Sequence, residues 1–133
     1  SDGKKVTGVV AEASVREKTY YADKFILATG GLYSGGITVR EFEKPQEMIF
    51  DLPVYIESGE ENWSNEQLFS HKPQGFAKTG VRTDKSLRPV DANNELVYEN
   101  VYVVGSNLGG YDFCFEHSGN GVALASAYKA ALM

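Results

Sequence analysis

Residues 101–132 read VYVVGSNLGGYDFCFEHSGNGVALASAYKAAL, and this stretch decides the fold of the chain. Its β-branched and aromatic beginning predicts a strand centred on Val101 to Val104. A series of glycines follows, and the alanine-rich end predicts a helix from about Gly121 to Leu132. Many nucleotide sites consist of such a strand, glycine-rich turn and helix, although the phosphate-binding pattern GxGxxG does not occur in this sequence.

A second glycine segment lies in KFILATGG, residues 24–31. Three apolar residues in succession, residues 25–27, precede the pair Gly30 and Gly31. A short apolar run that ends in glycines indicates a strand covered on both faces, as in a parallel sheet. Few other segments before Val101 are suitable parallel neighbours, so we expect the two strands to belong to one sheet.

The predicted fold class is mixed α/β, in a single fragment with three parts. Residues 1–31 hold a β-hairpin and the strand before ATGG, residues 32–80 an irregular α+β insertion, and residues 81–133 the late strand and the C-terminal helix. We expect the hairpin strands within residues 4–15 and 16–22, with the charged REK of residues 16–18 at the turn. Further strands are expected within residues 34–44 and 47–56 and near Val81. A short helix is expected at 64–69 and a polar turn at 91–94.

The composition argues against several classes of function. The 133 residues carry 13 basic and 18 acidic side chains, a net charge of −5, without a basic cluster that would suit nucleic acid. No apolar run approaches the roughly 20 residues that span a bilayer. One cysteine, Cys114, cannot form an internal disulfide, which fits a reducing compartment. The chain starts at Ser1 without an initiator methionine and stops at Met133 within a helical pattern, so we expect a fragment of a longer protein.

The start of the predicted helix is suited to binding negative charge. Its first amides lack partners within the helix and lie at the positive end of the peptide dipoles. The segment HSGNGV, residues 117–122, lets a flat ligand approach the backbone, and the pyrimidine edge of a flavin, which becomes anionic on reduction, is such a ligand. The alternative is that the glycines only cap a closely packed helix, the commoner meaning of a lone GNG. Because the helix is apolar nearly all round, we expect it to be buried against a sheet.

Several side chains have both a chemical and a structural interpretation. His117 could transfer a proton, but is more often a helix-entry residue with a satisfied hydrogen bond. Asp112 and Glu116 could bond ligand hydroxyls, although loop or cap residues need no such role. Cys114 is expected to be a small, buried apolar group. The arginines that could bind phosphate or carboxylate, but are expected to be solvated or ion-paired, are Arg40, Arg82 and Arg88.

No metal site is expected from the sequence. DANNE, residues 91–95, starts like a calcium loop. However, its sixth position is Leu96 instead of glycine and its twelfth is Tyr102 instead of glutamate.

Four blocks follow one another along the chain: ILATGGLYSGG, TDKSLRPVD, LGGYD and GNGVALASAY. In this order they resemble the C-terminal part of the B-subunit of anaerobic glycerol-3-phosphate dehydrogenase, a flavoprotein of the fumarate-reductase type. The resemblance covers nearly the whole chain. It implies a partial FAD/NAD(P)-binding Rossmann-like domain with a β-hairpin and a C-terminal helix on the sheet, whose N-terminal GxGxxG unit is missing.

The resemblance also implies a function. The expected activity is that of a flavin-dependent oxidoreductase that converts glycerol 3-phosphate to dihydroxyacetone phosphate and passes electrons to the quinone pool. The implied partners are a catalytic flavoprotein subunit and an iron–sulfur subunit that anchors the complex to the membrane, which places the protein in the cytoplasm at the inner face of the cell membrane. The implied cofactor is a flavin, FMN or FAD, expected to be absent from the isolated fragment, which would be inactive alone.

Two alternatives to this function stay open. One is a non-catalytic structural or assembly subunit that keeps the flavoprotein fold and organises its partners. The other is a different fumarate-reductase-type flavin oxidoreductase that acts on another small hydroxy or keto acid. The sequence identifies no catalytic base that would decide between them.

By the same resemblance, three groups of residues lie near the flavin. The residues expected near the adenylate or phosphates are Thr29, Gly30 and Gly31. Those expected near the ribityl chain are Gly105, Ser106, Gly109 and Gly110. Those expected to face the ring are Ser118, Gly119, Asn120, Gly121 and Val122. Many relatives carry an acidic residue where this chain has Ser106, and a serine is a weaker partner for a ribityl hydroxyl.

Overall fold

The computed structural model describes residues 3–12, 16–40, 43–57, 63–64, 66–67 and 71–133. Its strands are β1 (Gly8–Glu12), β2 (Glu17–Tyr21), β3 (Phe25–Leu27), β4 (Ile37–Thr38), β5 (Gln46–Glu47), β6 (Val54–Tyr55), β7 (Gly80–Val81) and β8 (Val101–Val103). Its helices are the short 3₁₀ helices η1 (Leu32–Ser34), η3 (Gly75–Lys78) and η4 (Gly105–Asn107) and the α-helix α1 (Gly119–Ala131). Small two-stranded sheets and one α-helix within these residues make a mixed α/β fold, as predicted.

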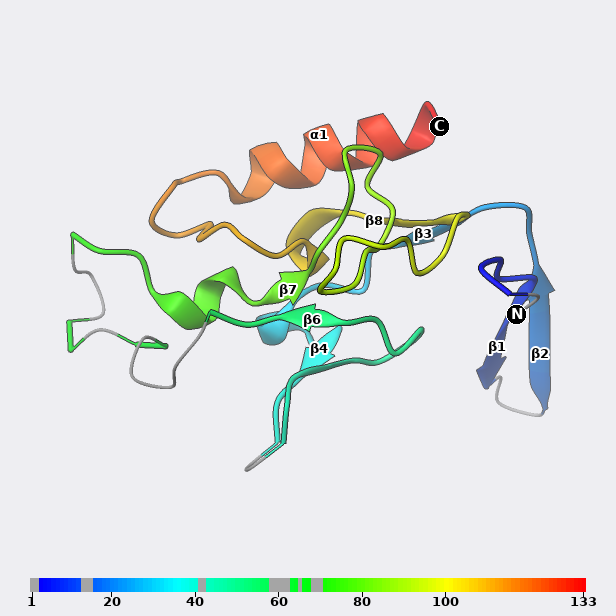
Figure 1. Cartoon of the computed structure of the whole chain (residues 1–133), viewed down its shortest axis with the longest axis horizontal. Coiled ribbons are helices and arrows are strands. Elements are labelled where there is room, and N and C mark those ends of the chain that lie inside the picture. The colour runs from blue at the N-terminus through cyan, green and yellow to red at the C-terminus, as the bar shows by residue number, and fades with distance from the viewer. Residues whose placement is uncertain (1–2, 13–15, 41–42, 58–62, 65, 68–70) are drawn as a thin grey trace.

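The two glycine segments follow strands of one sheet, because β3 and β8 pair in parallel (Figure 1). Phe25 lies opposite Val101 at the beginning of the pair. Beyond its end, the Val104 amide donates to the Leu27 carbonyl over 3.1 Å. The expectation of a shared sheet is confirmed. Since parallel strands end at the same edge of a sheet, both deliver the residues after them to one place.

One face of the β3–β8 pair covers the larger hydrophobic core. Leu27, Val101 and Val103 point to this face, and each is at most 3% exposed. Val81 of β7 belongs to the same buried cluster. Burying an aliphatic side chain stabilises the folded state by about 1.5–3 kcal/mol, so this cluster fixes the pair in its register.

The other face of the pair is only half covered. Tyr102 and Val104 pack there against Ala130 of α1. Ile26 pairs with Tyr102 and therefore points the same way, yet it is 52% exposed, because α1 covers the β8 side. The prediction that the ATGG strand is covered on both faces is wrong at Ile26.

Helix α1 lies over the β3–β8 pair and contacts the body along a narrow seam (Figure 1). Its buried residues are Ser126 and Ala130, one turn apart. On the opposite side Leu124, Tyr128 and Leu132 are 76%, 67% and 71% exposed. The prediction that this apolar helix is buried is therefore wrong, because no segment among the described residues covers its outer face.

The N-terminal strands β1 and β2 form the predicted antiparallel hairpin, which projects from one end of the molecule (Figure 1). Gly8 pairs with Tyr21 and Glu12 with Glu17. Glu17 and Lys18 lie in β2 and not in the turn, so the predicted position of the REK segment is wrong in this part. Residues 13–15 lie outside the described residues.

Asn100 joins the base of the hairpin to the central pair. Its Oδ1 accepts the Val6 amide over 2.9 Å, and its Nδ2 donates to the carbonyls of Val6 and Asp23 over 2.7 and 3.0 Å. The side chain is only 7% exposed. An asparagine satisfied by backbone groups on both sides holds two chain segments at a fixed distance.

The middle of the chain consists of short ladders, β4 with β5 and β6 with β7. The strands expected within residues 34–44 and 47–56 and near Val81 are confirmed as β4, β6 and β7. The predicted helix at 64–69 is not seen at Ser64 or Gln67, and residues 65 and 68–69 lie outside the described residues.

Two acidic side chains organise turns before β8. The predicted polar turn at 91–94 is confirmed, because Asp91 Oδ1 accepts the amides of Asn93 and Glu95 over 2.8 and 2.9 Å. Asp84 accepts the amides of Ser86 and Arg88 over 2.8 and 2.9 Å, and Oδ2 binds the Arg88 guanidinium at 2.7 Å. Partial burial alone would raise the pKa of the Asp84 carboxyl. This effect is outweighed by hydrogen bonds from the Arg88 amide and guanidinium and from the Ser86 amide, so the pKa is lowered.

The lowered pKa of Asp84 predicts a pH-dependent contribution to stability. A carboxyl whose folded pKa is lowered stabilises the fold above its ordinary value of 3.8 and loses that effect as the pH falls through the folded pKa. Asp84→Asn is expected to cost roughly 1–2 kcal/mol at pH 7. Urea denaturation of both proteins from pH 7 downward should show the difference shrinking below pH 3.8. A difference independent of pH would contradict this origin.

Candidate functional site: a cavity between the two glycine segments

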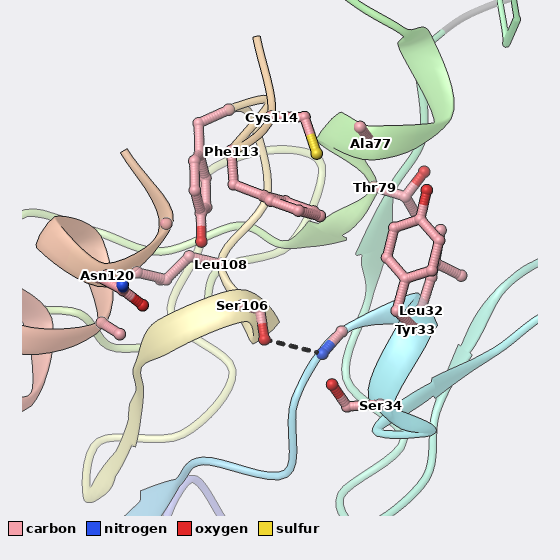
Figure 2. A pocket seen from close by; sticks show the side chains of 14 residues that line it. Leu32, Tyr33, Ser34, Ala77, Thr79, Ser106, Leu108, Phe113, Cys114 and Asn120 are labelled. Carbon is pink, nitrogen blue, oxygen red and sulfur yellow. Dashed lines mark hydrogen bonds between the residues drawn. The ribbon is translucent and has the colours of Figure 1, made fainter. Parts of the chain in front are cut away.

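A cavity of about 670 Å³ lies where the segments after β3 and β8 meet the start of α1 (Figure 2). Its lining comes from five stretches of chain: residues 31–34, Ala77 with Thr79, Ser106 with Leu108, residues 111–114 without Asp112, and Gly119, Asn120 and Ala123. Sites for small molecules typically measure about 300–1,000 Å³. The cavity is thus large enough for a ring system of several fused rings.

Asn107 fastens the two glycine segments together. It is fully buried, its Oδ1 accepts the Gly30 amide over 2.6 Å, and its Nδ2 donates to Thr29 Oγ1 over 2.9 Å. Next to it, Ser106 Oγ accepts the Gly31 amide over 3.2 Å, the contact drawn in Figure 2. These bonds hold the end of β3 against η4 and so define one wall of the cavity.

Gly31 is required for this close approach. A Cβ at Gly31 would lie 2.4 Å from the Ser106 carbonyl oxygen, far inside van der Waals contact. Glycine is the residue that lets two backbones come this near. The second glycine of ATGG is therefore explained by packing of the cavity wall, independently of any ligand.

The first turn of α1 forms another part of the wall. The Val122 amide makes the first intrahelical bond, to the Ser118 carbonyl at 2.8 Å, so the amides of residues 119–121 precede the helical ladder. Ser118 makes no side-chain capping bond, and its Oγ is buried without a partner. Gly119 and Asn120 line the cavity. A polar group of a ligand can therefore meet backbone donors at this end.

Ser126 anchors the helix in this position. Its Oγ accepts the Gly105 amide over 2.9 Å and donates to the Val122 carbonyl over 2.6 Å. Gly105 has a positive φ of 65°, which turns the chain from β8 into η4. One serine hydroxyl thus connects the end of the late strand to the helix that follows it.

The outer wall of the cavity is aromatic. The Tyr33 ring meets the rings of Phe76 and Phe113 edge to face, with centroids 6.2 and 5.9 Å away. Burial raises the pKa of Tyr33, and the charges of Cys114 and Asp112 raise it further. Burial likewise raises the pKa of Tyr111, with a contribution from Glu116. Both phenols of the wall are neutral hydrogen-bonding groups at neutral pH.

Asp112 holds the loop that carries this aromatic wall. Its carboxylate is 1% exposed and accepts the amides of Gln74 over 2.8 Å, Cys114 over 3.0 Å and Phe115 over 3.1 Å. It thereby ties residues 113–115 to the segment that leads into η3. A carboxylate suits this position because it only accepts hydrogen bonds, and all three partners are donors.

The structure tests three expectations about candidate side chains, which concern the cysteine, the histidine and the arginines. Cys114 is exposed and lines the cavity, so the prediction of a buried apolar group is wrong, because the Asp112 bonds turn this loop outward. His117 lies in the turn two residues before α1, with a positive φ of 54°, and its expected hydrogen bond stays a prediction. Arg88 is ion-paired with Asp84 and Arg82 lies over the Tyr55 ring. Neither arginine lines the cavity.

The structure brings part of the predicted flavin-site residues to the cavity. The residues that line it are Gly31, Ser106, Gly119 and Asn120. The others lie in the same segments but outside the lining: Thr29, Gly30, Gly105, Gly109, Gly110, Ser118, Gly121 and Val122. Sequence reasoning missed the organising roles of Asn107, Asp112 and Ser126. Asparagine and aspartate in a glycine-rich turn commonly bond backbone amides, which was the available signal.

The lining defines what the cavity can do chemically. Among the described residues that form it, none is an aspartate, glutamate, lysine, arginine or histidine. Groups of three or more metal-ligating side chains are absent from the described residues. Within the same residues, no helix has the length and hydropathy to cross a bilayer. The cavity therefore fits a flat, largely apolar ring with a polar edge toward the helix terminus.

A strand-to-helix site with two glycine turns and a ring-sized cavity is the architecture of a nucleotide-cofactor domain, and sequence comparison gives the class. The chain belongs to the FAD-binding domain family, whose model matches residues 33–122. This match includes the cavity wall from Tyr33 to the first turn of α1.

Curated relatives agree with the resemblance seen in the four sequence blocks. A probable anaerobic glycerol-3-phosphate dehydrogenase B-subunit of Halobacterium salinarum is 39% identical over 109 residues, 82% of this chain and 25% of the relative. The anaerobic glycerol-3-phosphate dehydrogenase B-subunit of Vibrio vulnificus is 39% identical over 110 residues, 83% of this chain and 24% of the relative. The chain thus spans about a quarter of the length of these relatives. No solved structure matches it.

Proposed function

We propose that the chain is the flavin-ring part of a flavoprotein oxidoreductase subunit, and that the cavity holds the ring. The observation that carries this proposal is the cavity itself, which is uncharged, ring-sized and bounded by the ends of two paired strands and the start of α1. FAD is the flavin we propose, in accordance with the family. We further propose a Rossmann-like arrangement in the parent protein, with residues 32–80 as an insertion between residues 1–31 and 81–133. Both ends of this insertion also line the cavity, through residues 32–34 and through Ala77 and Thr79.

The chain's own residues would hold the flavin in three ways. Gly31 and Ser106 present backbone along one wall, as expected for a site that a nucleotide crosses closely. Tyr33 and Phe113 present ring edges and faces to an aromatic ligand. Asn120 and the free amides at the start of α1 would meet the polar edge. Bound there, a flavin would supply the capacity to accept a hydride or electrons and pass them on.

For the whole protein we propose the activity carried by the names of the relatives. Those relatives are named as anaerobic glycerol-3-phosphate dehydrogenase B-subunits. The proposed reaction oxidises glycerol 3-phosphate to dihydroxyacetone phosphate, and electrons pass to the quinone pool. The proposed partners are a catalytic flavoprotein subunit and an iron–sulfur subunit that attaches the complex to the inner face of the cell membrane.

A second candidate is a non-catalytic subunit that keeps the flavoprotein fold and organises the complex. The favouring observation is the cavity's lack of cationic side chains among its described lining, since glycerol 3-phosphate carries a phosphate that arginine or lysine usually binds. In this case the flavin would relay electrons or be dispensable. Loss of flavin from the full complex without loss of assembly would favour this second candidate.

Titration of the chain with lumiflavin and FAD by calorimetry tests the ring site, with two matched variants. Ala123 lines the cavity and Ala127 lies one turn further along α1 outside the lining, and both are exposed. Ala123→Trp should fill the cavity and weaken binding of both flavins at least about tenfold, which corresponds to about 1.4 kcal/mol. Ala127→Trp should bind like the original chain. Absence of saturable binding to the original chain, or equal effects of the two variants, would refute the ring site.

A further inference from the structure

Asp112 is a buried charge behind the cavity wall that the proposed function leaves without a chemical role. Its carboxylate is 1% exposed and its partners are three backbone amides. Neither the ion pair of Lys78 with Glu57 nor that of Arg88 with Asp84 includes Asp112. Amide bonds satisfy a carboxylate without cancelling its net charge, so a negative field extends from Asp112 into its surroundings.

Among the described residues that line the cavity next to Asp112, none carries a positive charge that would neutralise this field. Asp112 lies between Tyr111 and Phe113, and both line the cavity. Lys78 stands between the lining residues Ala77 and Thr79, but its Nζ is 3.3 Å from a carboxylate oxygen of Glu57 and so serves that partner. An apolar lining also screens charge less than water does.

The start of α1 contributes positive charge that opposes the negative field of Asp112. The free amides of a helix terminus correspond to roughly half a unit of positive charge. The buried Asp112 carboxylate carries a negative charge, and Glu116, whose Oε1 accepts the Asp112 amide over 3.2 Å, adds one that water screens because the residue is exposed. The negative side therefore prevails on the wall formed by residues 111–114. The raised pKa values of Tyr33 and Tyr111 have contributions from these same two carboxylates.

We propose that Asp112 determines the charge preference of the wall formed by residues 111–114, which accepts an uncharged ring and disfavours anionic groups, while the polar edge of the ring lies at the start of α1. The identity of the ring as flavin rests on the proposed function, whereas the charge preference rests on the geometry of Asp112. It follows that the phosphate groups of the cofactor and the phosphate of a phosphorylated substrate are bound away from this wall.

The reactivity of Cys114 can report the charge of this wall. Cys114 is the single cysteine of the chain, is exposed and lines the cavity (Figure 2). Its thiolate displaces iodide from neutral iodoacetamide and from anionic iodoacetate by the same reaction. The ratio of the two rate constants, iodoacetate over iodoacetamide, cancels the fraction of thiolate and reports the local charge. N-acetylcysteine amide gives the ratio for a free thiol in the same buffer.

We expect the ratio at Cys114 to be lower than that of the free thiol at low ionic strength. The deficit should shrink with added salt, which shortens the Debye length from about 30 Å at 0.01 M to about 3 Å at 1 M. Asp112→Asn should raise the ratio about threefold, as expected for one charge removed at short range. Glu99→Gln removes an equal charge from an exposed residue before β8 and should leave the ratio unchanged.

The outcomes separate this inference from the proposed function. A ratio at Cys114 equal to that of the free thiol would overturn the charge preference without any variant, so a failure of Asp112→Asn to fold would not obscure the result. An equal rise in Asp112→Asn and Glu99→Gln would also overturn it. Because the measurement contains no flavin, a failed flavin titration with a low ratio would refute the ring site alone.

Discussion

Replacing Asn107 with alanine is expected to lower the free energy of unfolding by about 2 kcal/mol. The fully buried side chain bonds the partly buried Gly30 amide at 2.6 Å and the hydroxyl of the exposed Thr29 at 2.9 Å. Alanine removes both bonds and leaves the Gly30 amide without this partner, whereas water can reach Thr29. An unsatisfied buried polar group costs about 1–3 kcal/mol. Urea denaturation measures the loss, and hydrogen exchange of the Gly30 amide should accelerate more than exchange in the hairpin strands.

Ser106→Ala is the matched control for this variant. Ser106 is the neighbouring residue, accepts the adjacent Gly31 amide at 3.2 Å and is exposed. Ser106→Ala removes one bond, longer than either bond of Asn107, and no buried side-chain volume, so the expected loss is smaller, about 1 kcal/mol. Equal losses in the two variants would show that Asn107 does not fasten the glycine segments together.

Gly80→Ala is expected to destabilise the chain by about 2–3 kcal/mol, the usual cost of inserting a methyl group into filled space. A Cβ at Gly80 would lie 2.4 Å from the Gly109 nitrogen and 2.5 Å from the Leu108 carbonyl carbon. These are backbone atoms and cannot move aside as a flexible side chain would. The shift should separate β7 from the segment after η4 and weaken flavin binding, since Thr79 and Leu108 line the cavity on either side.

Gly121→Ala is the control for the glycine substitution. Nothing lies within 4 Å of a Cβ at Gly121, and the residue is in the first turn of α1. Alanine is a better helix former than glycine by about 0.5–1 kcal/mol, so this variant should be stabilised. Thermal denaturation of the two variants should therefore shift in opposite directions. Destabilisation by both would contradict the described packing around Gly80 or the position of Gly121 in the helix.

The central pair and the place of the site could be predicted from the sequence. The apolar run before Gly30 and the run at Val101 each predict a buried strand from local sequence. Because few other segments were suitable parallel neighbours, the two strands were expected to pair, as they do. The acceptor-rich turn at Asp91 is also local, because its partners lie within four residues. Elements whose bonds close over a few residues can be recognised from the order of residues alone.

The parts that could not be predicted depend on distant partners. Asn107 meets Gly30 across 77 residues and Asp112 meets Gln74 across 38, and nothing near either side chain in sequence specifies the partner. The exposure of Leu124 and Tyr128 had a different cause. An apolar pattern shows that a helix can be covered, whereas the coverage itself depends on which other segments are present.

The hydrogen bond between Gly30 and Asn107 has a consequence for how the molecule folds. Its two ends are 77 residues apart, so a long loop must close before either wall of the cavity exists. Such non-local pairing slows folding relative to a chain with mainly local contacts. Loop-closure entropy, however, grows only by about 0.6 kcal/mol for each doubling of loop length. A change of length between the two strands therefore costs little in closure entropy, and the cavity keeps its geometry where the change leaves residues 32–34, Ala77 and Thr79 in place.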